Sequence, residues 1–79
     1  MDEESIFFFT VGELIDILQQ HPKDMPVVIS GYKNGYENFY HPFVNKVIHL
    51  PENPFYEGIF QIDENGTEVL ILLREMRYD

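Results

Sequence analysis

The residue types that could bind a metal ion are few in this sequence, and their spacing is unsuitable. Histidine occurs at positions 21, 41 and 49, and Glu37 precedes His41 by four residues. That spacing would place both side chains on one face of a helix, but Pro42 and the preceding glycines oppose a helix there. Cysteine is absent, which excludes a zinc–thiolate site and a disulfide framework. We therefore expect no metal site and no cofactor.

Signatures of covalent or hydrolytic catalysis are also missing from the sequence. Ser30 stands beside Gly31, but the G-x-S-x-G turn that exposes a nucleophilic serine does not occur. The acidic stretch 63–68 lacks a glycine at the sixth position, which a calcium loop requires. A pair of catalytic carboxylates, as in glycosidases, is an interpretation that so acidic a chain leaves open. A small domain, however, has little room for the deep cleft of such an enzyme. We expect a binding protein, with an enzyme as an alternative.

The most distinctive stretch is the glycine- and aromatic-rich segment 31–43, which we call the aromatic loop. Its rings belong to Tyr32, Tyr36, Phe39, Tyr40 and Phe43. Tyrosine among glycine and asparagine is typical of binding loops, because tyrosine gives rigid contact area at a low entropy cost. The opposing interpretation is that the rings fold back as a lid over a small core. Our hypothesis is a partner-binding surface, with Phe39 and Phe43 inside, that is made by Tyr32, Tyr36, Glu37 and Tyr40.

The chain is short and strongly acidic. Its 79 residues suffice for one domain, 1–79, in which residues 1–4 and 75–79 are expected to fray. Fourteen acids against five Lys and Arg give a net charge of −9. Such a charge is repelled by nucleic acid and by anionic membranes, and it attracts a basic protein surface. Carboxylates that mimic the phosphates of a nucleic acid would be one specific form, and charge that serves solubility alone is the alternative.

Targeting signals are not apparent in the sequence. The N-terminus reads Met-Asp-Glu-Glu, which is acidic where a signal peptide is basic, and the apolar run 6–9 is too short for a signal core. No apolar run approaches the about 18 residues of a membrane span. The lack of cysteine fits a reducing compartment. We therefore expect a cytoplasmic protein.

A helix is the best-specified element of the chain. Thr10 and Glu13 have the spacing of a capping box, in which each side chain bonds the backbone N–H of the other residue. Apolar residues then recur at positions 11, 14, 15 and 18, which is the spacing of one buried helix face. Pro22 stops the helix, because the residue before a proline avoids the helical conformation. The sequence predicts a helix over residues 11–20.

The other apolar runs predict strands. Residues 27–29 are all β-branched, and residues 43–50, 55–62 and 68–73 follow as a β-meander separated by turn signals. The run 6–9 adds a fifth, short strand or docks on the core. We predict an α+β, two-layer domain with one N-terminal helix packed on an antiparallel sheet of about four strands. The predicted core residues are Leu14, Leu18, Ile29, Ile48, Phe60 and Ile71.

Residues 10–36 carry a distinctive arrangement of motifs. Thr10-Val-Gly-Glu-Leu-Ile is followed by Pro22-x-Asp24 and then by Val27-Val-Ile-Ser-Gly-Tyr-Lys-Asn-Gly-Tyr36. This arrangement resembles a class of small uncharacterised proteins of bacteria and their phages, with a GELI-type helix followed by a V-V-x-x-G-Y-x-x-G-Y segment. The resemblance implies a helix-then-strand start and a bacterial or phage setting. It transfers no functional residue.

The net negative charge, the aromatic loop and the lack of a catalytic or metal-binding motif lead to one hypothesis about function and one alternative. The hypothesis is a small acidic protein-interaction module that binds a basic partner surface, such as a phage-related accessory or inhibitor protein. The alternative is a small-ligand-binding domain with a pocket under the aromatic loop. We expect no direct contact with nucleic acid or membrane. The chain is expected to be either a monomer or a homodimer that covers a sheet edge.

Overall fold

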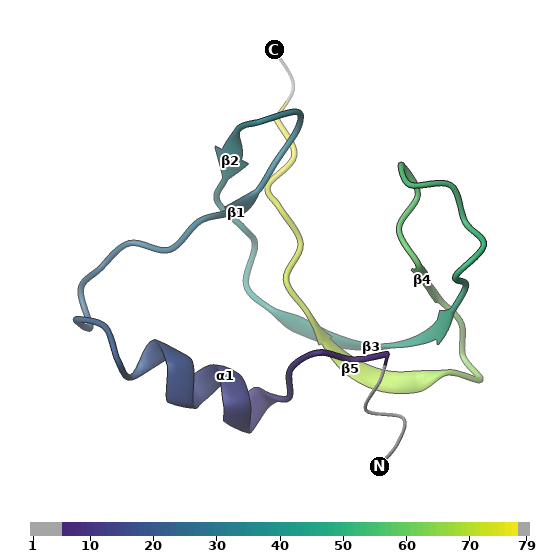
Figure 1. Cartoon of the computed structure of the whole chain (residues 1–79), viewed down its shortest axis with the longest axis horizontal. Coiled ribbons are helices and arrows are strands. Elements are labelled where there is room, and N and C mark those ends of the chain that lie inside the picture. The colour runs from purple at the N-terminus through teal and green to yellow at the C-terminus, as the bar shows by residue number, and fades with distance from the viewer. Residues whose placement is uncertain (1–5, 78–79) are drawn as a thin grey trace.

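One helix and five short strands make up the regular structure of residues 6–77, and they confirm the α+β class. These are the residues that the computed structural model describes, so the predicted leader 1–4 lies outside them. The elements, shown in Figure 1, are α1 (Val11–Leu18), β1 (Ile29–Ser30), β2 (Tyr36–Glu37), β3 (Phe43–His49), β4 (Phe60–Ile62) and β5 (Thr67–Ile71). All strand pairs are antiparallel. They form a two-stranded sheet, β1–β2, and a three-stranded sheet in the order β4–β3–β5.

The start of α1 follows the predicted capping box. The backbone N–H of Thr10 donates to Oε1 of Glu13 at 2.9 Å, and the backbone N–H of Glu13 donates to Oγ1 of Thr10 at 3.2 Å. These bonds satisfy groups that a helix start otherwise leaves without a partner. The helix ends at Leu18, earlier than the predicted residue 20, and a last turn follows before Pro22. Residues 6–77 contain no helix long and apolar enough to cross a membrane.

β3 is the centre of the three-stranded sheet. It pairs with the whole length of β5 and, through residues 47–49, with β4. Both neighbours therefore reach Val47, which lies opposite Thr67 in β5 and opposite Ile62 in β4. Val47 is 7% exposed and is the one buried apolar residue of the described chain. This order differs from the predicted meander, in which each strand would pair with the next.

The turn 63–66 explains the strand order. The backbone N–H of Gly66 donates to the Asp63 carbonyl at 2.9 Å, and the Asn65 N–H donates to Oδ1 of Asp63 at 2.8 Å. A turn therefore forms where the turn signal predicts one, but it does not close a hairpin, because β4 and β5 do not pair. The Gly66 backbone then lies against the backbone of Val47, where any Cβ would collide with the Val47 carbonyl. A glycine at this point lets the chain pass β3 closely, so that β4 and β5 pair with its two sides.

The helix and the strands do not share a core. Close packing between elements is found in the strand pairs, and α1 lies to one side of β3 and β5 (Figure 1). β1 pairs with β2 and not with β3, so the chain after α1 does not bring the helix over the larger sheet. Leu18 is 49% exposed and no residue of α1 is buried, so the predicted common core is wrong. The other predicted core residues are half-buried: Leu14, Ile29, Ile48, Phe60 and Ile71.

The predicted strands differ in how well the structure reproduces them. β3 and β5 fall within a few residues of the predicted runs, whereas residues 27–28 and 55–59 lie outside any strand. The run 6–9 has no strand pairing, so the fifth strand is not formed. The ring of Phe7 instead stacks on Phe60, with centroids 5.0 Å apart, which fixes this run beside the start of β4.

The capping box gives the first testable prediction. We predict that Thr10→Ala lowers the free energy of unfolding by about 0.5–2 kcal/mol, because the Glu13 N–H loses its side-chain acceptor. Chemical denaturation followed by far-UV circular dichroism measures the change. Thr10→Ser is the matched control, since it keeps the hydroxyl and should retain most of the stability. Equal midpoints for wild type and Thr10→Ala would contradict the capping role.

Two glycines should respond to alanine with opposite signs. Gly66→Ala should destabilise by about 1–3 kcal/mol, because the added methyl group meets the rigid backbone of β3. Gly12→Ala, in the first turn of α1, should stabilise by up to about 1 kcal/mol, since its nearest neighbour, Oγ1 of Thr10, is 4.0 Å from an added Cβ. Urea denaturation midpoints measure both. A Gly66→Ala protein as stable as wild type would show that the turn 63–66 does not press on Val47.

Candidate functional site

The first half of the aromatic loop is a small hairpin that carries two tyrosines at its tip. The strands β1 and β2 pair, and the N–H of Gly35 donates to the Tyr32 carbonyl at 3.1 Å to close the turn. Lys33 has a φ of 56° and is the left-handed residue of this turn. The turn thereby places Tyr32 and Tyr36 on either side of the tip.

The tyrosines of the aromatic loop differ in exposure. Tyr32 is 73% exposed, Tyr36 is 71% exposed and Tyr40 is 42% exposed. Phe39 is half-buried, in line with its predicted inward position. Phe43 is 40% exposed, so its predicted inward position is wrong. The tip of the hairpin is therefore a surface of two exposed rings, and the interpretation of the whole loop as a core lid does not hold.

The second half of the aromatic loop is held by the chain after β5. The N–H of Glu75 donates to the Asn38 carbonyl at 2.8 Å, and the N–H of Tyr40 donates to the Leu73 carbonyl at 2.9 Å. The N–H of Met76 donates to the hydroxyl oxygen of Tyr40 at 3.0 Å. The Tyr40 hydroxyl thus serves as an anchor within the chain, and Tyr32 and Tyr36 are the two most exposed rings of the aromatic loop.

Glu37 is turned toward its own chain. Nη2 of Arg77 lies 2.9 Å from Oε2 of Glu37, and Nε of Arg77 donates to Oε1 at 3.2 Å, which is the two-pronged geometry of a strong pair. The hydrogen bond and the charge of Glu37 raise the pKa of Arg77. A Cβ on Gly31 would lie 2.6 Å from Cγ of Glu37, so the glycine gives the carboxylate its room. Glu37 therefore positions the hairpin.

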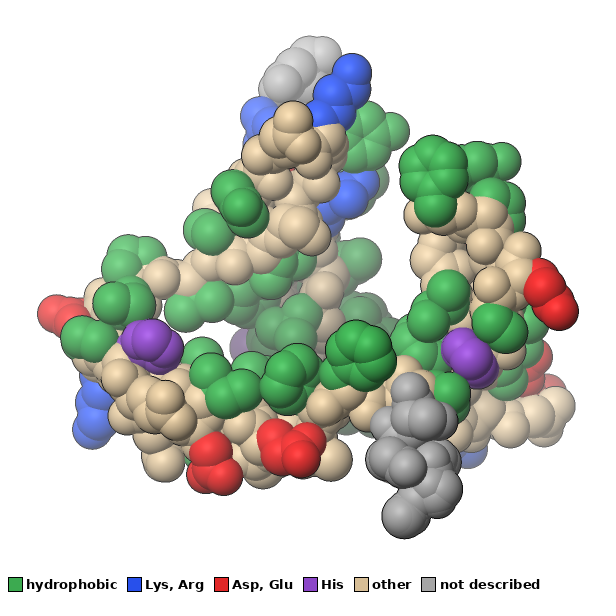
Figure 2. Space-filling model, viewed as in Figure 1, with side chains coloured by type: hydrophobic (Ala, Val, Ile, Leu, Met, Phe, Trp, Pro, Cys, Tyr) green, Lys and Arg blue, Asp and Glu red, His purple; other side chains and the backbone are tan. Residues whose placement is uncertain are grey.

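Basic side chains gather around the tip, which the sequence did not reveal. The guanidinium of Arg74 lies 5.1 Å from the centroid of the Tyr32 ring, in cation–π geometry. With Lys33 in the turn and Arg77 on Glu37, three of the five Lys and Arg residues belong to this region. Figure 2 shows blue side chains at the end of the molecule that carries β1 and β2. The sequence predicts fraying for residues 75–79; residues 75–77 make these contacts, and residues 78–79 lie outside the described chain.

The residues considered for catalysis or metal binding lie apart. Ser30 is exposed in β1. Nδ1 of His41 donates to the Pro42 carbonyl at 2.9 Å, and the ring of His49 lies 5.4 Å from that of Phe60. Within residues 6–77 no three His, Cys, Asp or Glu side chains come close enough to hold a metal ion.

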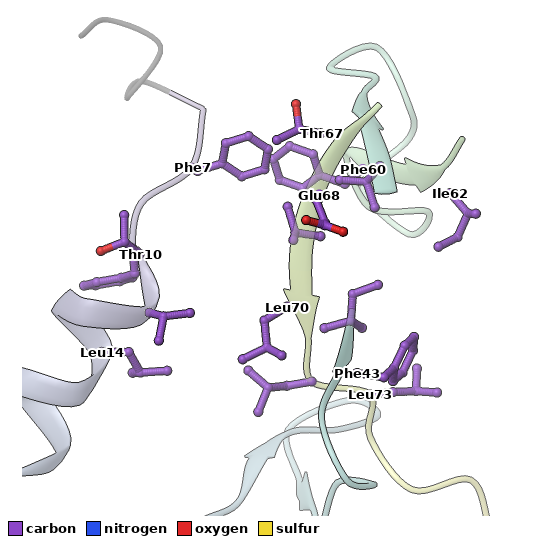
Figure 3. A pocket seen from close by; sticks show the side chains of 16 residues that line it. Phe7, Thr10, Leu14, Phe43, Phe60, Ile62, Thr67, Glu68, Leu70 and Leu73 are labelled. Carbon is purple, nitrogen blue, oxygen red and sulfur yellow. The ribbon is translucent and has the colours of Figure 1, made fainter. Parts of the chain in front are cut away.

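A wide groove opens between residues 7–14 and β5. It has a volume of about 1010 Å³, with Phe7, Thr10 and Leu14 on one wall and β5 on the other (Figure 3). A smaller groove of about 460 Å³ follows the end of α1. Neither groove is lined by the tyrosines of the aromatic loop. The larger groove does include Phe43, the last ring of the aromatic loop, and the predicted ligand pocket under that loop stays a prediction.

Comparison of the chain with protein-family models, with curated proteins and with solved structures finds no match. The resemblance of residues 10–36 to small bacterial and phage proteins stays a prediction. Function must accordingly be inferred from the geometry of the hairpin tip and from the distribution of charge.

The ion pair of Glu37 gives the third prediction. We predict that Glu37→Gln speeds hydrogen exchange at the Glu75 and Met76 amides, because Arg77 then no longer ties the C-terminal segment to β2. Nuclear magnetic resonance resolves the two amides. Glu64→Gln, in the turn 63–66, is the matched control with the same charge change. Equal exchange rates in wild type and Glu37→Gln would show that the ion pair does not hold the loop.

Proposed function

We propose that this chain is a small acidic protein-interaction module that uses its hairpin tip to contact a basic partner protein. The observation that supports it most is the exposure of Tyr32 and Tyr36, 73% and 71%, on a hairpin whose base is tied down by hydrogen bonds. Exposed aromatic rings in fixed positions are the usual anchors of protein interfaces. A phage-related accessory or inhibitor protein, acting in the cytoplasm, is the form of this function that the sequence favours.

The four predicted contact residues take two different roles in this proposal. Tyr32 and Tyr36 make the contact, and Arg74 under the Tyr32 ring limits the freedom that this ring would lose on binding. Glu37 and Tyr40 hold the hairpin, through Arg77 and Met76 respectively. The proposed contact surface therefore contains two of the four predicted residues, and the other two hold the hairpin in place.

The acidic charge acts at longer range in this proposal. The tip itself carries Lys33 and Arg74, so the carboxylates that attract a basic partner lie elsewhere, for example Glu13 and Asp16 on the exposed face of α1. Charge outside the contact raises the association rate and sets orientation more than it sets the lifetime of the complex. Binding should therefore weaken as salt screens the net charge of −9.

A pair of tyrosine substitutions tests the hairpin tip. A photo-crosslinking residue at position 36, introduced in the native cell, identifies the partner, and titration calorimetry then measures its affinity. Tyr32→Ala should weaken binding by about 1–2 kcal/mol or more. Tyr56→Ala is the matched control, because Tyr56 is also 73% exposed but lies outside the aromatic loop. Surface changes of this kind alter stability by only about ±0.5 kcal/mol, so a shared loss of fold is not expected.

Two outcomes would contradict this proposal. One is an affinity that Tyr32→Ala and Tyr56→Ala lower equally, because the tip would then have no special role. The other is a crosslinked partner that is itself acidic and binds more tightly as salt rises.

A further inference from the structure

β5 has an unpaired edge that faces the larger groove. Among residues 6–77, β5 pairs with β3 alone. The run 6–9 lies across the groove from it, as Figure 3 shows for Phe7, but no backbone hydrogen bond joins this run to β5. An edge strand of this kind presents a row of N–H and C=O groups that can pair with another strand.

The groove beside this edge is almost free of charge. Residues 67–73 all line it, and Val69, Leu70 and Ile71 are its central members. Glu68 is the one charged residue among its lining side chains. A basic segment would find a single carboxylate there, and an anionic lipid or ligand would find no cation. The lining therefore favours an apolar strand as the occupant.

The exposed surface of the chain is larger than that of a folded monomer of its size. The chain exposes 7124 Å² at a mass of 9.4 kDa, whereas monomers of this mass expose about 5000 Å². Half of the difference would already exceed the about 800 Å² that each partner buries in a standard interface. The chain as a whole therefore leaves open an area of the size that a stable dimer covers.

We propose that the β5 edge and the groove beside it form a dimerisation surface, in which β5 of a second copy of this chain pairs antiparallel with β5. A second copy supplies the strand that the edge lacks and the apolar side chains that the groove lacks. A two-fold axis through the strand pair makes the contact self-complementary, as in most homodimers. The two sheets then join into one, and neither edge of β5 is left open.

The position of Glu68 is compatible with this pairing. When the two strands pair around Val69, Glu68 lies opposite Leu70 of the second copy and not opposite the second Glu68. Like charges directly opposite one another destabilise a strand pair, and this register avoids that arrangement. The two carboxylates remain diagonal neighbours, so they weaken the dimer without preventing it.

The dimerisation surface is separate from the hairpin tip. It uses β5 and the start of the chain, whereas the proposed partner contact uses Tyr32 and Tyr36. Added salt should change the affinities of the two associations in opposite directions. Two copies that each carry a charge of −9 repel, so salt should tighten the dimer, whereas salt should weaken the binding of a basic partner.

Analytical ultracentrifugation of the purified full chain tests the dimer. Between about 1 and 200 µM the mass should rise from that of the 9.4 kDa chain to twice that value, and the midpoint should fall to lower concentration between about 20 and 500 mM salt. Hydrogen exchange at residues 67–71 should slow over the same concentration range, because their outer edge becomes paired.

Three substitutions locate the surface. Leu70→Glu places a carboxylate directly opposite Glu68 of the second copy and should raise the dimer dissociation constant at least about tenfold. Val44→Glu is the matched control with the same charge change: Val44 is 58% exposed and lies opposite Leu70 on β3, but it does not line the groove. Glu68→Gln removes the one charge of the groove and should tighten the dimer, a gain that an unfolded protein could not produce.

Two results would overturn the dimerisation surface. One is a chain that stays monomeric over the whole concentration range at high salt, whether the groove then stays open or closes on its own residues 6–9. The other is a dimer that Val44→Glu weakens and that Leu70→Glu and Glu68→Gln leave unchanged. Tyr32→Ala should not alter the dimer, so failure here leaves the proposed partner contact untouched.

Discussion

The pairing of β3 with both β4 and β5 is the constraint on which the rest of the structure depends. Val47, at the meeting point, is the one buried apolar residue among those described, and the Gly66 backbone lies directly against it. The chain continues the same antiparallel course beyond the sheet, where residues 73–75 bond residues 38–40 and Arg77 reaches Glu37. The hairpin tip is therefore positioned by strand pairing that begins far from it.

Strand pairing of this kind defines the course of the backbone, but it does not by itself bury apolar side chains in a core. A sheet of three strands becomes stable when at least one face is covered, and an eight-residue helix in isolation is marginal in water. In this chain α1 stands beside the sheet with Leu18 and Ile15 about half exposed. The proposed dimer along β5 would bury apolar surface that the chain alone leaves exposed, and this is the physical reason for proposing it.

The sequence predicted what is local and failed at what is distant. The capping box of Thr10 and Glu13 depends on residues that are near in the chain, and it is found as predicted. A turn also forms at residues 63–66, but the hairpin that the sequence indicated there does not, because β4 and β5 do not pair. The buried position of Leu18 depends on what the helix meets, and periodicity alone does not say which surface that is. The strand order failed for a related reason, because a short turn after β4 normally returns the chain to β4. Only the contact of Gly66 with Val47 reveals the crossing.

The candidate site shows the same division between local and distant information. Composition left two interpretations of the aromatic loop open, an exposed contact surface and a core lid, and in the structure Tyr32 and Tyr36 are exposed. It could not show that Arg74 and Arg77 return to that loop, since their register follows from the β3–β5 pairing. The result is an acidic protein with a locally basic, aromatic tip. A partner attracted by the net charge of −9 must therefore present its own aromatic or acidic groups to the tip, beside a surface that is basic as a whole.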